Sequence, residues 1–179
     1  MTVNHPPKDL PPSLQSDLFK TDPKEYSDAY TEHLIEQYKL YVVSHEKISE
    51  RRQETNKFFL TLNTLLLGGA SYLLDTKLDL AAVLLVGLGA GILICYFWYR
   101  IIRSYDGLNT GKFTVLHAVE ARLPLALYDT EWGVLGRGKD PTKYLPFTKI
   151  ERKIPVVFMV AYTVLIYFFL LKNLGIDIL

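Results

Sequence analysis

Cysteine is almost absent from the sequence, since Cys95 is the only one among 179 residues. A single thiol excludes a disulfide framework within one chain, and it excludes a zinc site built from several cysteines. A secretory signal is also missing from the opening residues, MTVNHPPKDLPP, and the first long apolar stretch starts only at Phe58. We therefore expect that stretch to act as an internal membrane anchor.

Charged side chains are missing from three runs, residues 58–74, 80–99 and 154–171. A helix needs about 20 residues, within a range of about 17 to 25, to cross a hydrocarbon layer of about 30 Å. Little other apolar sequence is left that could cover three such helices in a soluble domain. The sequence therefore predicts an all-α integral membrane protein with three transmembrane helices and long helical cytoplasmic extensions.

Lysine and arginine are scarce on one side of this arrangement. Three spans place the N-terminus and residues 100–153 on one side, and the turn 75–79 and the tail 172–179 on the other. Of the 20 basic residues, Lys77 and Lys172 fall on the second side, which leaves 18 on the first. By the positive-inside rule the N-terminus is cytoplasmic and the C-terminus is external in this multi-pass protein.

The overall charge is close to balanced, at +1, with acidic residues mixed among the basic ones. This mixture argues against nucleic acid as a dedicated partner. Membrane lipids are the expected partners of the basic residues near the bilayer, which can meet anionic headgroups. These residues are Arg51, Arg52, Lys57, Arg100, Arg103, Arg152 and Lys153.

The N-terminal part divides into a tail and a helix. Residues 1–23 hold five of the nine prolines, which predicts a disordered tail. A capping arrangement at Asp22 and Pro23 predicts a cytoplasmic stalk helix over 24–57, which continues into the first span because Gly and Pro are absent up to Leu67. One face of this helix should pack on a helix of the same or another subunit, and it carries Tyr30, Leu34, Tyr38, Tyr41, His45 and Ile48.

Glycines and prolines return in the central cytoplasmic segment, residues 100–153. We expect the second span to continue as a helix to Asp106 and to break at Gly107 and at residues 109–111. Further on, Gly133 to Asp140 nearly fits a phosphate-binding loop, but Asp140 replaces the metal-binding hydroxyl and no strand precedes the glycine. A turn is the favoured interpretation, and a nucleotide-dependent switch that uses Lys139 and Asp140 is the lesser alternative.

The sequence has no arrangement that predicts catalysis, a cofactor or a metal. Its four histidines are scattered, and no serine lies in a nucleophile elbow. The spans do carry small and hydroxylated faces, which in lipid favour close helix packing and, as a second interpretation, the lining of a pore. The residues of these faces are Thr61, Thr64, Gly68 and Ser71 in the first span and Gly87 and Gly91 in the second.

Four phrases of the sequence resemble the RipA family of small bacterial membrane proteins, in the same order around the spans. They are YKLYVVSHEKISERRQETNKFFLTLNT, WYRIIRSYDGLNTGKF, LPLALYDTEW and GRGKDPTKYLPFTKIERKIP, and the likeness covers roughly residues 30–160. The resemblance implies a protein of the bacterial cytoplasmic membrane that assembles into an octamer, in a family linked to adaptation and intracellular growth. It brings no catalytic motif to this chain.

Two hypotheses of function follow. The first is a non-enzymatic homo-oligomer, octamer-like by the resemblance, with a structural or stress-adaptive role in the bacterial inner membrane. The second is an oligomeric channel or membrane-permeabilising effector whose pore is lined by Thr61, Thr64 and Ser71. Partner proteins other than further copies of the chain stay open.

Overall fold

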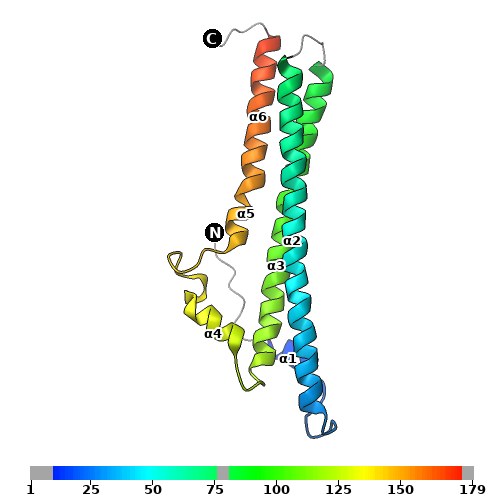
Figure 1. Ribbon diagram of the computed structural model, residues 1–179, viewed down its shortest axis with the longest axis vertical. Helices are drawn as coiled ribbons and strands as arrows, with labels where there is room; N and C mark the ends of the chain where they lie inside the picture. The colour runs from blue at the N-terminus through cyan, green and yellow to red at the C-terminus, as the bar shows by residue number, and fades with distance from the viewer. Residues whose placement is uncertain (1–9, 76–80, 175–179) are drawn as a thin grey trace. The chain divides into compact units, whose positions relative to one another are not determined.

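The computed structural model describes residues 10–75 and 81–174, and these residues form helices without any strand. Figure 1 shows the helices in chain order. They are α1 (Pro12–Leu18), α2 (Tyr30–Asp75), α3 (Ala81–Glu120), α4 (Leu127–Val134), the short 3-10 helix η1 (Gly136–Gly138), α5 (Phe147–Glu151) and α6 (Lys153–Asn173).

The chain divides into two compact units, and α2 and α3 contribute to both. The first unit extends to Glu50 and includes Tyr105–Pro146, and the second unit contains Arg51–Ser104 and the chain from Phe147 onward. The first unit thus holds α1, α4 and η1, and the second holds α5 and α6.

Part of the proline-rich start is helical, so the prediction of a disordered tail over 1–23 is wrong for residues 12–18. Pro12 occupies the first helical position, where its fixed φ favours a helix and its missing N–H costs nothing. The end of the helix is anchored, because the guanidinium of Arg122 lies 3.2 Å from the centroid of the Phe19 ring. Residues 1–9 lie outside the described residues.

The stalk helix begins later than the capping pattern predicts, at Tyr30 and not at residue 24. The Asp22 carboxylate does accept a hydrogen bond from the backbone N–H of Lys24, at 2.8 Å. The Asp22 carbonyl also accepts bonds from the N–H groups of Glu25 and Tyr26. The capping residues therefore form a single turn before the helix starts.

Two helical stretches are long and apolar enough to cross a membrane, Leu84–Glu120 and Phe147–Asn173. The single chain buries only 28% and 17% of their most apolar windows. The core helix of a soluble protein would bury most of such a window, so these two helices fit a membrane protein. The predicted first span, 58–74, lies within α2, which is not among the stretches that pass the same test in the described residues.

The predicted turn 75–79 and the predicted tail 172–179 each begin inside a helix. The turn 75–79 starts at the last residue of α2, and its residues 76–79 lie outside the described residues. The tail 172–179 starts inside α6, which ends at Asn173, and its residues 175–179 also lie outside them.

Helix α3 continues without a break through Gly107 and through residues 109–111, where the sequence predicts one. A glycine inside a helix costs only about 1 kcal/mol relative to alanine. The hydrogen bond of 2.8 Å between Asn109 and His45, together with the buried Thr114, holds this part of α3 against α2. Tertiary packing therefore outweighs the local preference to end the helix.

Candidate functional site

A buried asparagine joins the three long helices of the second unit. Asn63 on α2 is fully buried, and its side-chain oxygen accepts hydrogen bonds from the Cys95 thiol on α3 and the Tyr162 hydroxyl on α6, each at 3.0 Å. Its side-chain amide donates to the Phe59 carbonyl of its own helix, at 2.8 Å. One neutral side chain thus links α2, α3 and α6, which lie side by side in Figure 1.

The Tyr162 ring fits against α3 only because residue 91 has no side chain. A Cβ atom placed on Gly91 would lie 2.4 Å from Cζ of Tyr162, far closer than van der Waals contact allows. Leu88, Cys95 and Tyr162 form the buried cluster around this contact. Gly91, which the sequence places on a helix-packing face, therefore packs within the chain.

A tryptophan fixes the register of α2 and α3 at the end of the apolar segment. Trp98 is 1% exposed, and its indole N–H donates to the Asn56 side-chain oxygen at 2.9 Å. Its ring stacks on Phe59 with centroids 5.7 Å apart and lies 6.2 Å from the Phe158 ring of α6. These contacts set the level at which the three helices meet.

The first unit has a buried carboxylate in place of the buried amide. Glu120, at the end of α3, is 1% exposed and accepts the Tyr38 hydroxyl at 2.9 Å. It also accepts the backbone N–H groups of Tyr128 and Asp129, at 2.9 and 3.1 Å. Both N–H groups belong to the first turn of α4, so Glu120 binds α2 and the positive end of the α4 dipole at once.

The tyrosines around Glu120 are held in their neutral form. Burial raises the pKa of Tyr38, and the hydrogen bond to Glu120 raises it further. Burial likewise raises the pKa of Tyr128, with the charges of Glu46, Glu120 and Glu131 acting in the same direction. A second negative charge beside the carboxylate would be repelled, so the phenol of Tyr38 remains a hydrogen-bond donor at neutral pH.

The predicted stalk face turns toward α3 within the same chain. His45 is buried, bonds to Asn109 and packs edge-on against the Phe113 ring, with centroids 4.6 Å apart. The ammonium of Lys112 lies 4.3 Å from the centroid of the Tyr41 ring and donates to the Ser44 hydroxyl at 2.8 Å. The other members of the face are half-buried, and they are Tyr30, Leu34, Tyr38 and Ile48.

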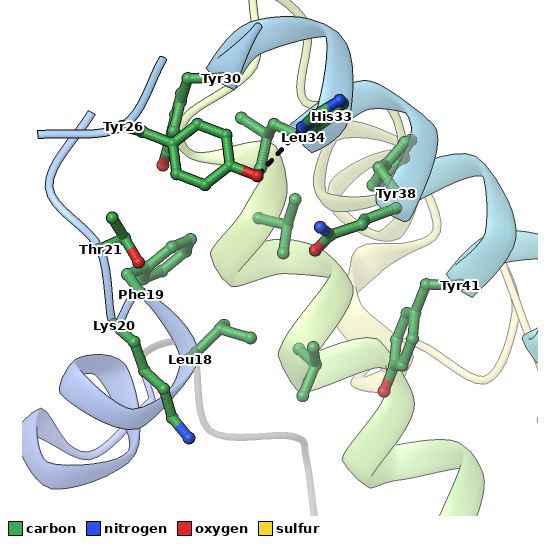
Figure 2. A pocket seen from close by; sticks show the side chains of 13 residues that line it. Leu18, Phe19, Lys20, Thr21, Tyr26, Tyr30, His33, Leu34, Tyr38 and Tyr41 are labelled. Atoms are coloured by element: carbon green, nitrogen blue, oxygen red, sulfur yellow. Dashed lines mark hydrogen bonds between the residues drawn. The ribbon is translucent and has the colours of Figure 1, made fainter. Parts of the chain in front are cut away.

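A pocket of about 300 Å³ opens in the first unit beside this face. Figure 2 shows tyrosine rings of α2 and of the segment before it around the pocket, with Lys20 on the side of α1. The Tyr26 hydroxyl and the His33 Nδ1 atom are hydrogen-bonded at 3.0 Å. Aliphatic side chains complete the walls, from Leu18, Leu34, Val115 and Val119.

The hydroxylated face of α2, in the predicted first span, points away from the other helices of its own chain. Thr61, Thr64, Gly68 and Ser71 are all exposed, and a Cβ atom placed on Gly68 would meet nothing within 4 Å. The Thr64 and Ser71 hydroxyls each donate to the carbonyl four residues earlier, at 2.8 Å. This face is therefore unused by the single chain.

Gly87, the other glycine of the predicted packing face on α3, differs from Gly91 in its surroundings. Gly87 is half-exposed, and a Cβ atom placed on it would also meet nothing within 4 Å. The six small residues of the predicted faces thus divide into one that packs within the chain, Gly91, and five that a single chain leaves accessible.

The loop that resembles a phosphate-binding motif is a tight turn. Gly136, Arg137 and Gly138 all have positive φ, at 69°, 53° and 67°. The Asp140 carboxylate accepts the hydroxyl and the backbone N–H of Thr142, at 2.6 and 3.0 Å, and these bonds lower its pKa. Asp140 is thereby occupied within its own turn, and Arg137 is paired with Asp129 at 3.0 Å.

Asn63, Glu120 and Tyr162 are the residues that the sequence reasoning missed. An asparagine inside an apolar run is a recognisable signal, because a polar side chain in a span must find a partner. Glu120 gives no such signal, because a glutamate at the end of a helix is ordinary on a solvated surface. Among the described residues, no group of three or more His, Cys, Asp or Glu side chains lies close enough to hold a metal ion.

Comparison with known proteins identifies the chain at the level of its family. No curated protein and no solved structure matches it. A family model described as the octameric membrane protein family (8xMP) matches residues 35–171. This match covers most of α2 and all of α3, α4, α5 and nearly all of α6, and therefore includes both buried polar centres. The chain belongs to the octameric membrane protein family.

Proposed function

We propose that the chain is a non-enzymatic protein of the bacterial cytoplasmic membrane, with a structural or stress-adaptive role, that works as an assembly of eight copies. The family supports the number of copies. The observation that carries the proposal is the exposed small-residue face of α2, which a single chain leaves without a partner. The likeness to the RipA family supports the location and the adaptive role.

Three membrane spans are part of this proposal, with the N-terminus cytoplasmic and the C-terminus external. The two partners of Asn63 lie within the stretches Leu84–Glu120 and Phe147–Asn173, which are apolar enough to cross a membrane. Residues near 63 in α2 must then lie at the same depth as Cys95 and Tyr162. A polar amide at that depth is tolerated because it is bonded to neighbouring helices.

The subunit contact is proposed to use Thr61, Thr64, Gly68 and Ser71. Helices associate in lipid mainly through close packing of small residues, since no hydrophobic effect drives them together there. Gly68 lies in the middle of this face and has open space around it in the single chain. A neighbouring subunit would place its own helix in that space.

The test is the mass of the purified protein in mild detergent, by native mass spectrometry, for the natural chain and for Gly68→Leu. We expect eight copies for the natural chain and mostly smaller species for the variant, with unchanged helix content by circular dichroism. Gly133→Leu is the matched control, because it adds the same side chain to α4, outside the proposed spans, where open space also surrounds the glycine. A natural chain that is monomeric at working concentrations would overturn the proposal.

A channel is the second candidate, and the same face favours it. The hydroxyl protons of Thr64 and Ser71 are already donated to their own helix, so their oxygens could face cations or water along a central axis. The measurement is ion flux through liposomes that contain the octamer. Absence of flux at every pH and potential tested, with the protein inserted, would exclude the channel, and the structural role would be the remaining candidate.

A further inference from the structure

The second unit carries a band of basic residues at one end of its apolar segments. Eight lysines and arginines lie in residues 51–57, 100–103 and 149–153, against two acidic residues, Glu54 and Glu151. Five of the eight are exposed in the single chain. These five, which we call the cationic band, are Arg51, Lys57, Arg100, Arg103 and Lys153.

Contacts between the helices place these residues at one level. The Trp98 indole is bonded to Asn56, which sets Arg100 and Arg103 of α3 beside residues 51–57 of α2. The Arg52 guanidinium lies 3.5 Å from the Glu151 carboxylate, which sets the start of α6 beside the same part of α2. The band therefore crosses the middle of α2, the middle of α3 and the start of α6 at one level, although its members are far apart in sequence.

Little negative charge offsets this band within the second unit. Glu151 is half-buried and paired with Arg52, so Glu54 is the exposed carboxylate that remains in the three segments. None of the five cations of the band makes an ion pair with another residue in the described part of the chain. Their charges are thus available to an external anion.

Exposed aromatic rings lie next to the band on the apolar side. Phe58 follows Lys57 and is 61% exposed, and Phe97 and Tyr96 precede Arg100 and are 59% and 47% exposed. Aromatic side chains gather at headgroup level in membranes, and basic side chains extend from there toward the lipid phosphates. The order from apolar surface through aromatic ring to cation matches the order of layers in a phospholipid leaflet.

We propose that the cationic band binds the headgroups of anionic phospholipids, and that the protein therefore gathers such lipids around its cytoplasmic end. The anions are those of lipids because the cations are spread over three helices beside apolar surface. A site for a small free anion would instead converge on one point. The proposal rests on the membrane insertion in the proposed function, but it depends neither on the number of copies nor on a pore.

The test is the composition of the lipid that stays bound after reconstitution in nanodiscs of equal parts phosphatidylcholine and phosphatidylglycerol, followed by native mass spectrometry. We expect the natural chain to retain phosphatidylglycerol in excess over phosphatidylcholine. The double variant Arg100→Gln/Arg103→Gln should lower that ratio by roughly fivefold for each cation removed. High salt should reduce the excess in the natural chain, because exposed charges are screened.

Lys39→Gln/Lys47→Gln is the matched control, since it removes two exposed cations from α2 in the first unit. It should keep the ratio of the natural chain. Equal retention of the two lipids by an inserted natural chain would overturn the proposal and leave the proposed function standing. The proposal would also be overturned if the control variant lowered the ratio of phosphatidylglycerol to phosphatidylcholine as much as Arg100→Gln/Arg103→Gln does. Loss of the phosphatidylglycerol excess of the natural chain in millimolar inorganic phosphate would overturn it as well. A chain that alkaline carbonate extracts from the membrane would refute both proposals.

Discussion

Each of the two units has a buried polar side chain that joins several of its helices, and these two side chains differ in charge. In the first unit the carboxylate of Glu120 accepts hydrogen bonds from two backbone N–H groups and one phenol. In the second unit the neutral amide oxygen of Asn63 accepts hydrogen bonds from a thiol and a phenol. A buried ion is tolerated where three donors and a helix N-terminus surround it, whereas the proposed membrane spans favour a neutral group, because a charge in lipid is far more costly.

Loss of the charged centre should have the largest effect. We expect Glu120→Ala to destabilise the first unit by about 3 kcal/mol, because it leaves the Tyr38 hydroxyl and two N–H groups of α4 without their acceptor. Hydrogen exchange at the amides of Tyr128 and Asp129 should accelerate, and it can be followed by mass spectrometry in detergent. The stability of Glu120→Gln should lie between those of the natural chain and Glu120→Ala, since an amide keeps one acceptor oxygen but adds a donor.

The specificity of this result is tested in the second unit. Exchange in residues 84–104 should change little in Glu120→Ala, because none of the bonds of Glu120 reaches that unit. An equal acceleration in both units would contradict the view that each has its own polar centre. Unchanged exchange at Tyr128 and Asp129 would show that Glu120 does not cap α4.

Loss of the neutral centre should cost less. Asn63→Leu removes the acceptor for Cys95 and Tyr162, and hydrogen bonds between helices in lipid contribute about 0.6 kcal/mol each on average, so we expect a loss of about 1 to 2 kcal/mol. The measurement is thermal unfolding in detergent of Asn63→Leu, Tyr162→Phe and the double variant. The double variant should lose less than the sum of the two single variants.

The control for Asn63→Leu is Thr163→Val. Thr163 follows Tyr162 on α6, and its hydroxyl donates to the Met159 carbonyl of its own helix, at 2.8 Å. This substitution should leave the unfolding temperature of the chain nearly unchanged. Strict additivity of Asn63→Leu and Tyr162→Phe would contradict a bond between these side chains.

The sequence predicts the helices of this protein better than its polar centres. Apolar periodicity and the absence of glycine predict a helix from residue 24 to Leu67, and α2 contains residues 30–67 of it. The predicted small face of α3 contains Gly91, whose contact with Tyr162 the structure gives. The partners of a buried side chain cannot be read in the same way. Glu120 and Tyr38 are 82 positions apart, and nothing local marks them as a pair.

Local rules also fail where packing opposes them. Gly107 and residues 109–111 predict a helix end, but α3 continues through them because His45 and Phe113 pack across the helix pair. Asp22 predicts a helix start, but its bonds are completed within one turn, so the helix begins eight residues later at Tyr30. In both places the local signal is real, and tertiary contacts decide the boundary.

The smallest effect concerns pH and distinguishes the charged centre from the neutral one. The pKa of Tyr38 is raised in the folded protein, by burial and by the bond to Glu120, above the ordinary value of about 10. A raised pKa means that Tyr38 stabilises the fold fully below that ordinary value, and that this contribution is lost as pH rises above it, because the unfolded chain ionises first. The stability advantage of the natural chain over Tyr38→Phe should therefore be constant up to about pH 9 and should shrink above about pH 10. The free energy of unfolding in denaturant, measured across this range for both chains, checks the prediction.

The control is the same pair of chains with Glu120→Gln added to each. The stability advantage of Tyr38 over Phe should then shrink less with rising pH, because the Tyr38 phenolate would face a neutral amide in place of a carboxylate. An advantage that stays constant up to pH 11 would mean that Tyr38 does not titrate against a buried charge, and the contrast between a charged first unit and a neutral second unit would lose its electrostatic basis.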